Sequence, residues 1–375
     1  MINRNNQNKF LEILRGGLWE QDVQISKFEK FDFKEVYRIA QEQSVIGVVA
    51  AGLEHVTDLK IPQEIALIFA SSVLHLEQRN KAMNKFVAQI IEKLQKDSVY
   101  TILVKGQGIA QCYERPLWRA CGDVDLLLSE MNYSKAAMVL KEGASYIDDE
   151  NDYNKHLAMN INGWIVELHG TLYSGLWRNL DKIIDDVQKE VLYGGKVRSW
   201  VDERTQVFLP HPDEDIVFIF AHILQHFYKE GVGLRQICDW CRLLWTYKET
   251  INKRLLESRI RQMGVMSEWK AFAALAVDNL GMPVEAMPFY SNRTRWRKKG
   301  AKVMDFVLQS GNFGHNRDYS YYEKYPYVVV KAISLWRHLV DFCRYFVIFP
   351  LDAIKVTWRK ICIGLSVAIK GKRHE

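Results

Sequence analysis

Two aspartates one residue apart carry the clearest chemical signal in this sequence. Asp123 and Asp125 stand in the run DVDLLL, which has the composition of a buried β-strand. Because successive side chains of a strand point to opposite faces, both carboxylates share one face while Val124 and Leu126 point into a core. Two such carboxylates repel each other unless a cation lies between them. Hard oxygen ligands of this kind suit Mg²⁺.

A Lys-Gly pair precedes the aspartates by one short helix-length. Gly106 would let the backbone approach a phosphate closely, with amides of the following helix directed at it. Lys105 and Arg119 are candidate phosphate contacts, although Arg119 could equally be a structural partner of Asp123. A glycine turn for phosphate, combined with a D-x-D strand for metal, is the chemistry of nucleotidyl transfer.

A glutamate in a later apolar strand is the candidate third carboxylate. Glu167 stands in the run WIVELH, where an acid is rarely buried unless it is paired or binds a metal. On a strand next to that of the aspartates it could reach the same ions; the alternative is an acid at the rim of the sheet, paired with a lysine. His169 shares its face and could orient Glu167 or contact a phosphate, with a core histidine as an equal alternative.

The order of these residues resembles the nucleotidyltransferase superfamily of the DNA polymerase β type. More narrowly, it resembles a largely uncharacterised bacterial nucleotidyltransferase family with a KG…Y…R…DxDLL pattern and a later ELH strand. The resemblance extends over about residues 40–280. The matching residues are Lys105-Gly106, Tyr113, Arg119, Asp123-Val124-Asp125-Leu126-Leu127 and Glu167-Leu168-His169.

The expected reaction is transfer of a nucleoside monophosphate from an NTP to an acceptor hydroxyl. Asp123 and Asp125 would bridge two Mg²⁺ ions about 3.5–4 Å apart, with Mn²⁺ as an alternative. One ion would bind the triphosphate, and the other, with Glu167, would activate the acceptor. The acceptor stays open between a sugar, a polysaccharide precursor and a protein. The alternative functions are a non-catalytic nucleotide-binding module and a membrane-associated assembly factor acting through its tail.

The periodicity of apolar residues divides the chain into four parts. Residues 1–97 and 206–285 have helical spacing, and residues 98–205 mix strands with helices. Residues 286–375 are interpreted as a basic, aromatic connector and tail. The expected fold is therefore α+β, with a small mixed sheet as the nucleotidyltransferase core and helical regions on its N-terminal and C-terminal sides.

Within the mixed region, a hairpin is the strongest local prediction. Asn162-Gly163 stands between two alternating runs, at 156–160 and 164–168, and this dipeptide favours a two-residue turn. The other elements that we expect are a strand over 99–104, a helix over 107–113, a strand over 124–128, a helix over 134–142 and a strand over 196–201.

The composition is that of an ordinary globular chain of 375 residues, 48% hydrophobic and 26% charged. No apolar run reaches the roughly 18–20 residues that span a bilayer, and the polar start of the sequence lacks a signal-peptide pattern. Six cysteines without regular spacing are typical of reduced thiols. We therefore expect a cytoplasmic protein.

The positive charge of the chain is concentrated at its end. Residues 331–375 contain nine Lys/Arg and three Asp/Glu, which accounts for the whole net charge of +6. Over residues 327–372, apolar helical turns alternate with basic residues, a pattern that suits an interfacial helix on the inner face of an anionic membrane. A helix docked on the rest of the protein is the alternative, and Pro350 interrupts either one.

A second basic cluster surrounds Trp296. It could bind nucleic acid or a phosphorylated acceptor, but a solvated surface segment is the favoured interpretation. Its members are Arg293, Arg295, Arg297, Lys298, Lys299 and Lys302.

Two histidines and two cysteines at helical spacing offer an alternative metal site. His222 and His226 share one helical face, and so do Cys238 and Cys241. Together they could bind zinc. The spacing differs from that of common zinc fingers, and each pair also suits ordinary helix packing.

The helical half also offers candidate contacts for the acceptor. The family that the sequence resembles has a helix with histidines and a later aspartate, which is Asp239 here. Lys229, Arg235 and Asp239 could therefore line the acceptor side of the cleft.

Overall fold

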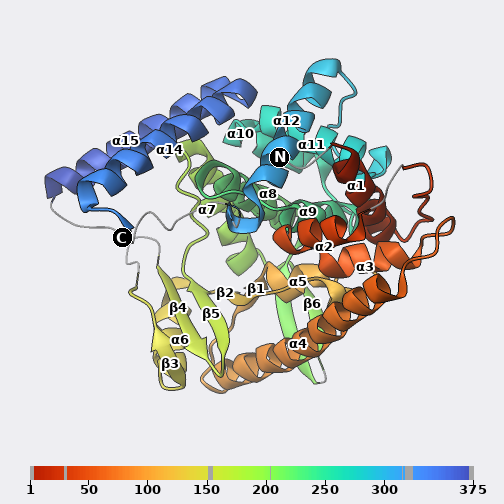
Figure 1. The fold of residues 1–375 in the computed structure, drawn as a ribbon. Coiled ribbons are helices and arrows are strands. Elements are labelled where there is room, and N and C mark those ends of the chain that lie inside the picture. The colour runs from red at the N-terminus through yellow and green to blue at the C-terminus, as the bar shows by residue number, and fades with distance from the viewer. Residues whose placement is uncertain are drawn as a thin grey trace.

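The run with the two aspartates forms an inner strand, β2 (Asp123–Leu127), of a five-stranded sheet in a computed structural model of the chain (Figure 1). The strand order is β1-β2-β5-β4-β3, in which β2 and β5 are parallel and the other neighbours are antiparallel. The other strands are β1 (Ile102–Val104), β3 (Ala144–Ile147), β4 (His156–Ile161) and β5 (Trp164–His169). This mixed sheet beside a large helical part confirms the expected α+β class.

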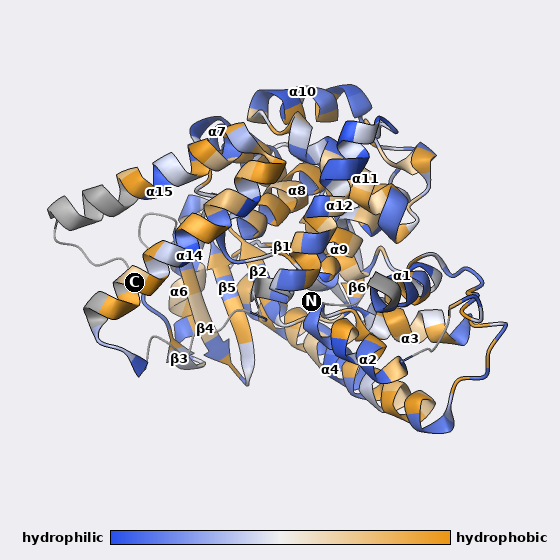
Figure 2. Cartoon of the chain, turned by 45° about the horizontal axis from the view of Figure 1, so that its top comes forward, coloured by the Kyte–Doolittle hydropathy of each residue, from blue (hydrophilic) through white to orange (hydrophobic). Residues whose placement is uncertain are grey.

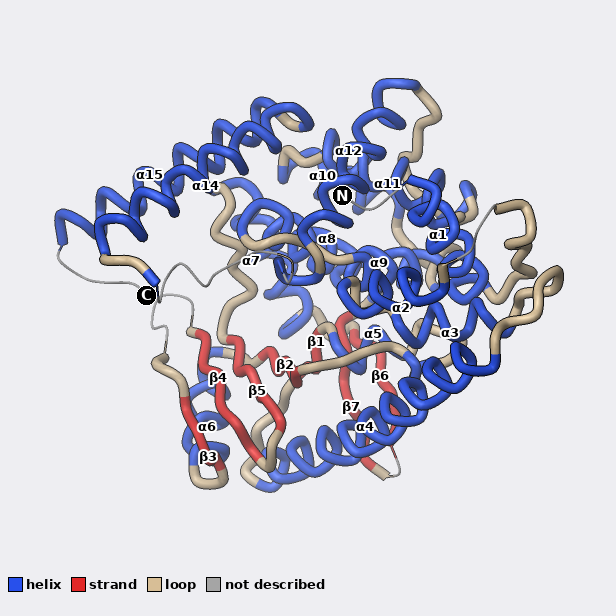
Figure 3. Tube along the Cα trace, viewed as in Figure 1, coloured by secondary structure: helices blue, strands red, loops and turns tan. Residues whose placement is uncertain are grey.

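The structure describes residues 4–28, 32–150, 155–202, 204–314, 316 and 324–370. The expected connector and tail over 286–375 therefore extend in part outside the described residues. The strands gather on one side of the molecule, and most helices lie on the other (Figure 3).

The β4–β5 hairpin follows from its turn. Asn162 and Gly163 both have positive φ, at 53° and 82°, as a tight two-residue turn requires. The predicted hairpin is confirmed, with each strand one residue longer than expected. A two-residue turn leaves no freedom of register, so His156 lies opposite His169.

One face of the sheet is apolar and packs on two helices. Val124 and Leu126 of β2 are buried together with Leu168 of β5, as the strand alternation predicts. They join one core with α4 (Gln63–Lys96) and α6 (Glu130–Lys141). Fully burying one such side chain contributes about 1.5–3 kcal/mol. The opposite face of the sheet, which carries Asp123 and Asp125, does not take part in this core.

Several elements of this region differ from the sequence prediction. The strand expected over 99–104 begins only at Ile102, and neither β3 nor the helix α7 (Arg178–Tyr193) is predicted. The helix expected from residue 134 begins at Glu130, because the Ser129 hydroxyl accepts the amide of Asn132 and caps it. The strand β6 (Val197–Asp202) pairs with an unexpected partner, β7 (Thr205–Pro210). A proline at the last position of a strand needs no ladder donor, so Pro210 does not prevent pairing.

The helices form the larger part of the structure. Their bounds are α1 (Arg4–Trp19), α2 (Phe33–Glu42), α3 (Ile46–Glu54), α5 (Gly106–Ala110), α7 (Arg178–Tyr193), α8 (Pro212–Lys229), α9 (Leu234–Thr246), α10 (Lys253–Met263), α11 (Met266–Leu280) and α12 (Thr294–Ser310). N-terminal and C-terminal helices share one apolar core. Trp19 of α1 donates its indole N–H to the carbonyl of Leu280 at 2.6 Å.

The basic cluster lies at the start of a helix, α12, where the sequence predicts a connector. Trp296 is buried against the helices beneath it, and Arg295 stacks on its ring at 4.4 Å. Arg297 pairs with Asp278 of α11 at 2.8 Å. The sequence around Trp296 is polar and therefore predicts a connector. The aromatic packing of Trp296 explains why the segment forms a helix instead.

The tail forms two helices, α14 (Tyr327–Ile348) and α15 (Pro350–Lys370), which meet at Pro350. Tyr345 and Phe349 pack against Phe227 of α8, with ring centroids 5.4 and 6.0 Å apart. The tail is therefore docked along one side. By length and hydropathy, every helix in the described part of the chain falls short of a transmembrane span.

A buried glutamate lies where α15 meets the helical body. Glu268 of α11 is fully buried and accepts the Tyr228 hydroxyl at 3.0 Å. Burial, and then the neighbouring Asp352 of α15, raise the pKa of Glu268 well above its usual value. A carboxyl in this position favours the protonated form.

Glu268→Gln should make stability less dependent on pH. With a raised folded-state pKa, the contribution of Glu268 is fully present below the unfolded-state pKa and is lost as pH rises toward the folded-state value. Glutamine cannot ionise and still accepts from Tyr228. Urea unfolding between about pH 5 and pH 9 should show a smaller loss for the variant than for wild type. Parallel curves for variant and wild type would contradict this, and Glu249→Gln, at an exposed residue, is the control.

Candidate active site

Five chemically active side chains lie on one face of the sheet, on three neighbouring strands. Asp125 of β2 is the register partner of Glu167 on β5, and His169 of β5 is the partner of His156 on β4. Asp123 precedes Asp125 by two residues and shares its face. The expectation that Glu167 lies on the strand next to the aspartates, with His169 beside it, is confirmed.

The three carboxylates form a candidate metal group. One oxygen each of Asp123, Asp125 and Glu167 lies within 4.8 Å of the others. Repulsion by Asp125, and then burial, raise the pKa of Asp123. A cation among these oxygens would relieve the repulsion, and an all-oxygen set is the one that Mg²⁺ prefers. The residues present therefore fit a divalent cation.

Lys105 supplies a positive charge beside this group. Its Nζ lies 2.7 Å from Oδ1 of Asp125. Burial alone would lower the pKa of Lys105, but Asp125 and then Glu167 outweigh it and raise the pKa. The amine therefore stays charged and compensates part of the carboxylate charge.

The Lys-Gly turn holds this amine in place through an unusual backbone conformation. Lys105 has φ 58° and ψ −145°, which is rare for a residue with a side chain. Gly106 follows at φ 39°, and a Cβ there would approach Sγ of Cys121 to 3.2 Å. Strain of this kind persists where the surroundings enforce it, often at functional sites. The next helix, α5, spans only residues 106–110 and is shorter than expected.

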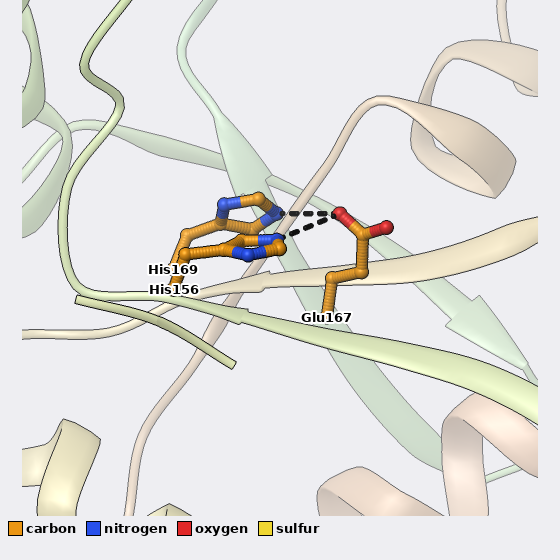
Figure 4. A group of neighbouring side chains, drawn as sticks. All are labelled: His156, Glu167 and His169. Carbon is orange, nitrogen blue, oxygen red and sulfur yellow. Dashed lines mark hydrogen bonds and ion pairs between the residues drawn. The ribbon is translucent and has the colours of Figure 1, made fainter. Parts of the chain in front are cut away.

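Two histidines bind the acidic groups directly (Figure 4). His169 Nε2 lies 2.8 Å from Oδ1 of Asp125 and 3.4 Å from Oε2 of Glu167. His156 Nε2 lies 3.2 Å from the same Glu167 oxygen. Burial would raise the pKa of Glu167, but the bonds from His156 and His169 lower it. For Asp125, Lys105 and His169 likewise outweigh burial and lower the pKa.

A cavity of about 450 Å³ opens over these residues. The helical part closes it from the other side, mainly through α8 and α9. Burial, and then the charge of Lys105, lower the pKa of His222 well below its usual value, so this wall presents a neutral imidazole. The helical lining includes Phe218, Ile219, His222, Gln225, His226, Arg235, Gln236 and Asp239.

A family model described as uncharacterised nucleotidyltransferase matches residues 29–281, which include every residue of this site. The chain belongs to that nucleotidyltransferase family. The match confirms the resemblance that the Lys-Gly, D-x-D and ELH residues indicate. No curated protein and no solved structure matches the chain.

Arg119 pairs with Asp239 of α9, and not with Asp123, the structural partner that the sequence offers as an alternative to a phosphate. Its guanidinium binds Asp239 of α9 through two bonds, of 3.0 and 2.5 Å. Tyr113 donates its hydroxyl to the same aspartate at 2.8 Å. The pair ties the loop before β2 to the helical wall of the cavity. Arg119 and Asp239 both line the cavity, and a phosphate contact of Arg119 stays a prediction.

The helical half contains two further sets of candidate residues, the acceptor contacts and the zinc ligands. Arg235 lines the cavity, whereas Lys229 donates to the carbonyl of Ser174 at 2.7 Å. Cys238 and Cys241 are fully buried in α9. Among the described residues, no group of three or more metal-binding side chains combines either cysteine with His222 or His226. The zinc interpretation is therefore unsupported, and the histidine pair belongs to the cavity wall instead.

His156 is the site residue that the sequence prediction missed. Its signal is the hairpin itself, because a two-residue turn at Asn162-Gly163 places His156 opposite His169. The remaining expected site residues, Lys105 and Gly106, do line the cavity. Their contact with a nucleotide stays a prediction.

Arg119→Met should destabilise the protein by about 3–5 kcal/mol, because it leaves Asp239 buried without its charge partner. Urea unfolding measures the loss. The matched control is Arg261→Met, which removes an exposed pair with Glu257 and should cost about 1 kcal/mol or less. Equal stability of the two variants would show that the buried pair is not a structural tie.

Proposed function

We propose that the protein transfers a nucleoside monophosphate from an NTP to an acceptor hydroxyl with the help of divalent cations. The observation that supports this most is the convergence of Asp123, Asp125 and Glu167 within 4.8 Å, beside the charged Lys105. Membership of a nucleotidyltransferase family supports the same reaction class. Because all three acids are present and converge, we favour an enzyme over a non-catalytic nucleotide-binding module.

Asp123, Asp125 and Glu167 would hold two Mg²⁺ ions, with Mn²⁺ as the alternative. Bound there, the cations would neutralise charge on the triphosphate and lower the pKa of the acceptor hydroxyl. The residues of the chain do the positioning. His169 fixes the orientation of Asp125 and Glu167 through its bonds to both.

Lys105 is placed to bind the triphosphate. Its half-buried side chain lines the cavity, and Asp125 holds its Nζ. When other positive charge compensates Asp125, the amine is free to turn to a phosphate oxygen within the same cavity. Gly106 leaves the backbone beside it open to the phosphates.

The helical wall is placed to bind the acceptor. His222, Gln225 and His226 line the cavity opposite the carboxylates. Imidazole and amide groups exchange hydrogen bonds with hydroxyls without requiring a charge. Of a sugar, a polysaccharide precursor and a protein, a sugar hydroxyl fits this wall best.

Asp125→Asn should remove most nucleotidyl transfer, on the order of 100-fold or more, because one ligand and one negative charge are lost at the cations. The assay is Mg²⁺-dependent release of pyrophosphate from each NTP with a panel of sugars, with mass spectrometry of the products. Asp185→Asn, at an exposed residue of α7, is the matched control. Transfer by Asp125→Asn at the wild-type rate would refute the metal assignment.

We also propose that the tail lies against an anionic membrane surface. One side of α14 and α15 is docked, but large apolar side chains remain exposed on the other, and both helices are rich in hydrophobic residues (Figure 2). Basic residues such as Arg344 and Lys355 alternate with them. The exposed apolar residues of the two helices are Val329, Leu335, Trp336, Leu339, Phe346, Val347, Leu351, Ile354, Trp358 and Ile361.

The double variant Leu335→Ser, Leu351→Ser should bind anionic vesicles more weakly than wild type. Binding of both should fall with added salt, since each basic residue contributes about 1 kcal/mol that ions screen. Vesicle co-sedimentation measures this. Leu67→Ser, Leu74→Ser is the matched control, because these leucines are exposed on α4. Equal binding by all three proteins, or no binding of wild type, would contradict the proposal.

A further inference from the structure

The β4–β5 hairpin directs two imidazoles and a carboxylate toward one point (Figure 4). Nε2 of His156 and Nε2 of His169 lie 3.2 and 3.4 Å from the same oxygen of Glu167. One ligand atom from each of the three residues lies within 4.8 Å of the others. The three side chains all line the cavity, so small ions and solvent reach them.

The backbone already holds these side chains in a fixed arrangement. His156 and His169 are direct cross-strand partners, and their rings lie 4.9 Å apart. Glu167 precedes His169 by two residues and shares its face. The tight turn at Asn162-Gly163 fixes the register of the two strands. Binding of an ion would exchange the bonds of these imidazoles to Glu167 and Asp125 for bonds to the ion.

The donor set differs from that of the three carboxylates. Two imidazole nitrogens and one carboxylate oxygen suit Mn²⁺, Fe²⁺, Co²⁺ or Zn²⁺, whereas Mg²⁺ prefers oxygen ligands alone. A set of two histidines and one carboxylate also leaves coordination positions open. Lys105 makes its ion pair with Asp125, outside this set.

We propose that His156, Glu167 and His169 form a site for a transition-metal cation, next to the all-oxygen site and sharing Glu167 with it. The site would select a cation with affinity for nitrogen, and its open positions would accept an oxygen of a substrate. Which cation binds at each of the two neighbouring sites then depends on whether the site offers nitrogen or only oxygen ligands. In the proposed transfer reaction, such an ion would act on the Glu167 side of the site. Binding of the metal alone requires no nucleotide, so the site can be tested apart from that reaction.

The test is Co²⁺ binding to the full, metal-free chain, followed by visible absorption, with Mg²⁺ binding measured by calorimetry. His156→Gln should weaken Co²⁺ binding by about 10–100-fold or more and change Mg²⁺ binding by less than about threefold. The matched control is His75→Gln, at an exposed histidine of α4, which should bind both metals as wild type does. Equal Co²⁺ affinity of His156→Gln and wild type would overturn the proposal.

A second measurement does not depend on a variant. Pulsed electron paramagnetic resonance of Mn²⁺ bound to wild type should show coupling to imidazole nitrogen, and a spectrum without it would overturn the site. Asp123→Asn separates this inference from the proposed function. Loss of Mg²⁺ binding in that variant, with the nitrogen coupling retained, supports two distinct positions. Loss of the nitrogen coupling as well would show a single centre that requires Asp123, and would refute a separate histidine site.

Discussion

The parallel pairing of β2 with β5 is the constraint on which the candidate site depends. It places Asp125 directly beside Glu167, although the 36 residues 128–163, including a helix and two antiparallel strands, separate the two strands. Like charges on neighbouring strands oppose such pairing. The opposite face of the same strands supplies the compensation, because Val124, Leu126 and Leu168 are buried there. Apolar burial on one face thus stabilises an electrostatically unfavourable arrangement on the other, which only cations can fully balance.

The helical part contributes more than a scaffold to this arrangement. Arg119 and Asp239 are 120 residues apart in sequence, yet their buried pair fixes the distance between the sheet and α9. Asn80 of α4 holds the same loop from behind, donating to the carbonyl of Arg119 at 2.8 Å, while Gln107 donates to Asn80. The cavity walls are therefore positioned by polar contacts that cross the whole molecule, and the shape of the cavity depends on elements far from the carboxylates.

Local rules of sequence predicted the parts of this structure that depend on neighbours in the chain. Alternation predicted the buried and polar faces of β2, and the Asn-Gly turn predicted the hairpin. The family resemblance added the pairing of Asp123 and Asp125 with Glu167. Contacts between distant segments were beyond such rules, as the partner of Arg119 shows. Trp296 shows a second limit of such rules. Its basic neighbours predict an exposed segment, whereas the structure buries its side chain against the helix beneath it. His156 was predictable in principle, since register follows from turn length.

The contact between α1 and α11 has a consequence for how the chain is made. Arg15 donates to the carbonyl of Asn279 at 2.7 Å, which closes a loop of 264 residues. The α1 helix packs closely on α3, where Gly17 meets Gly52, so most of its apolar face can be covered early. Its contact with α11 cannot form until α11 has left the ribosome, and at about 5–20 residues per second this delays the contact by roughly 13–50 s. The closure between the two distant helices is therefore a late, long-range step, of the kind that slows folding.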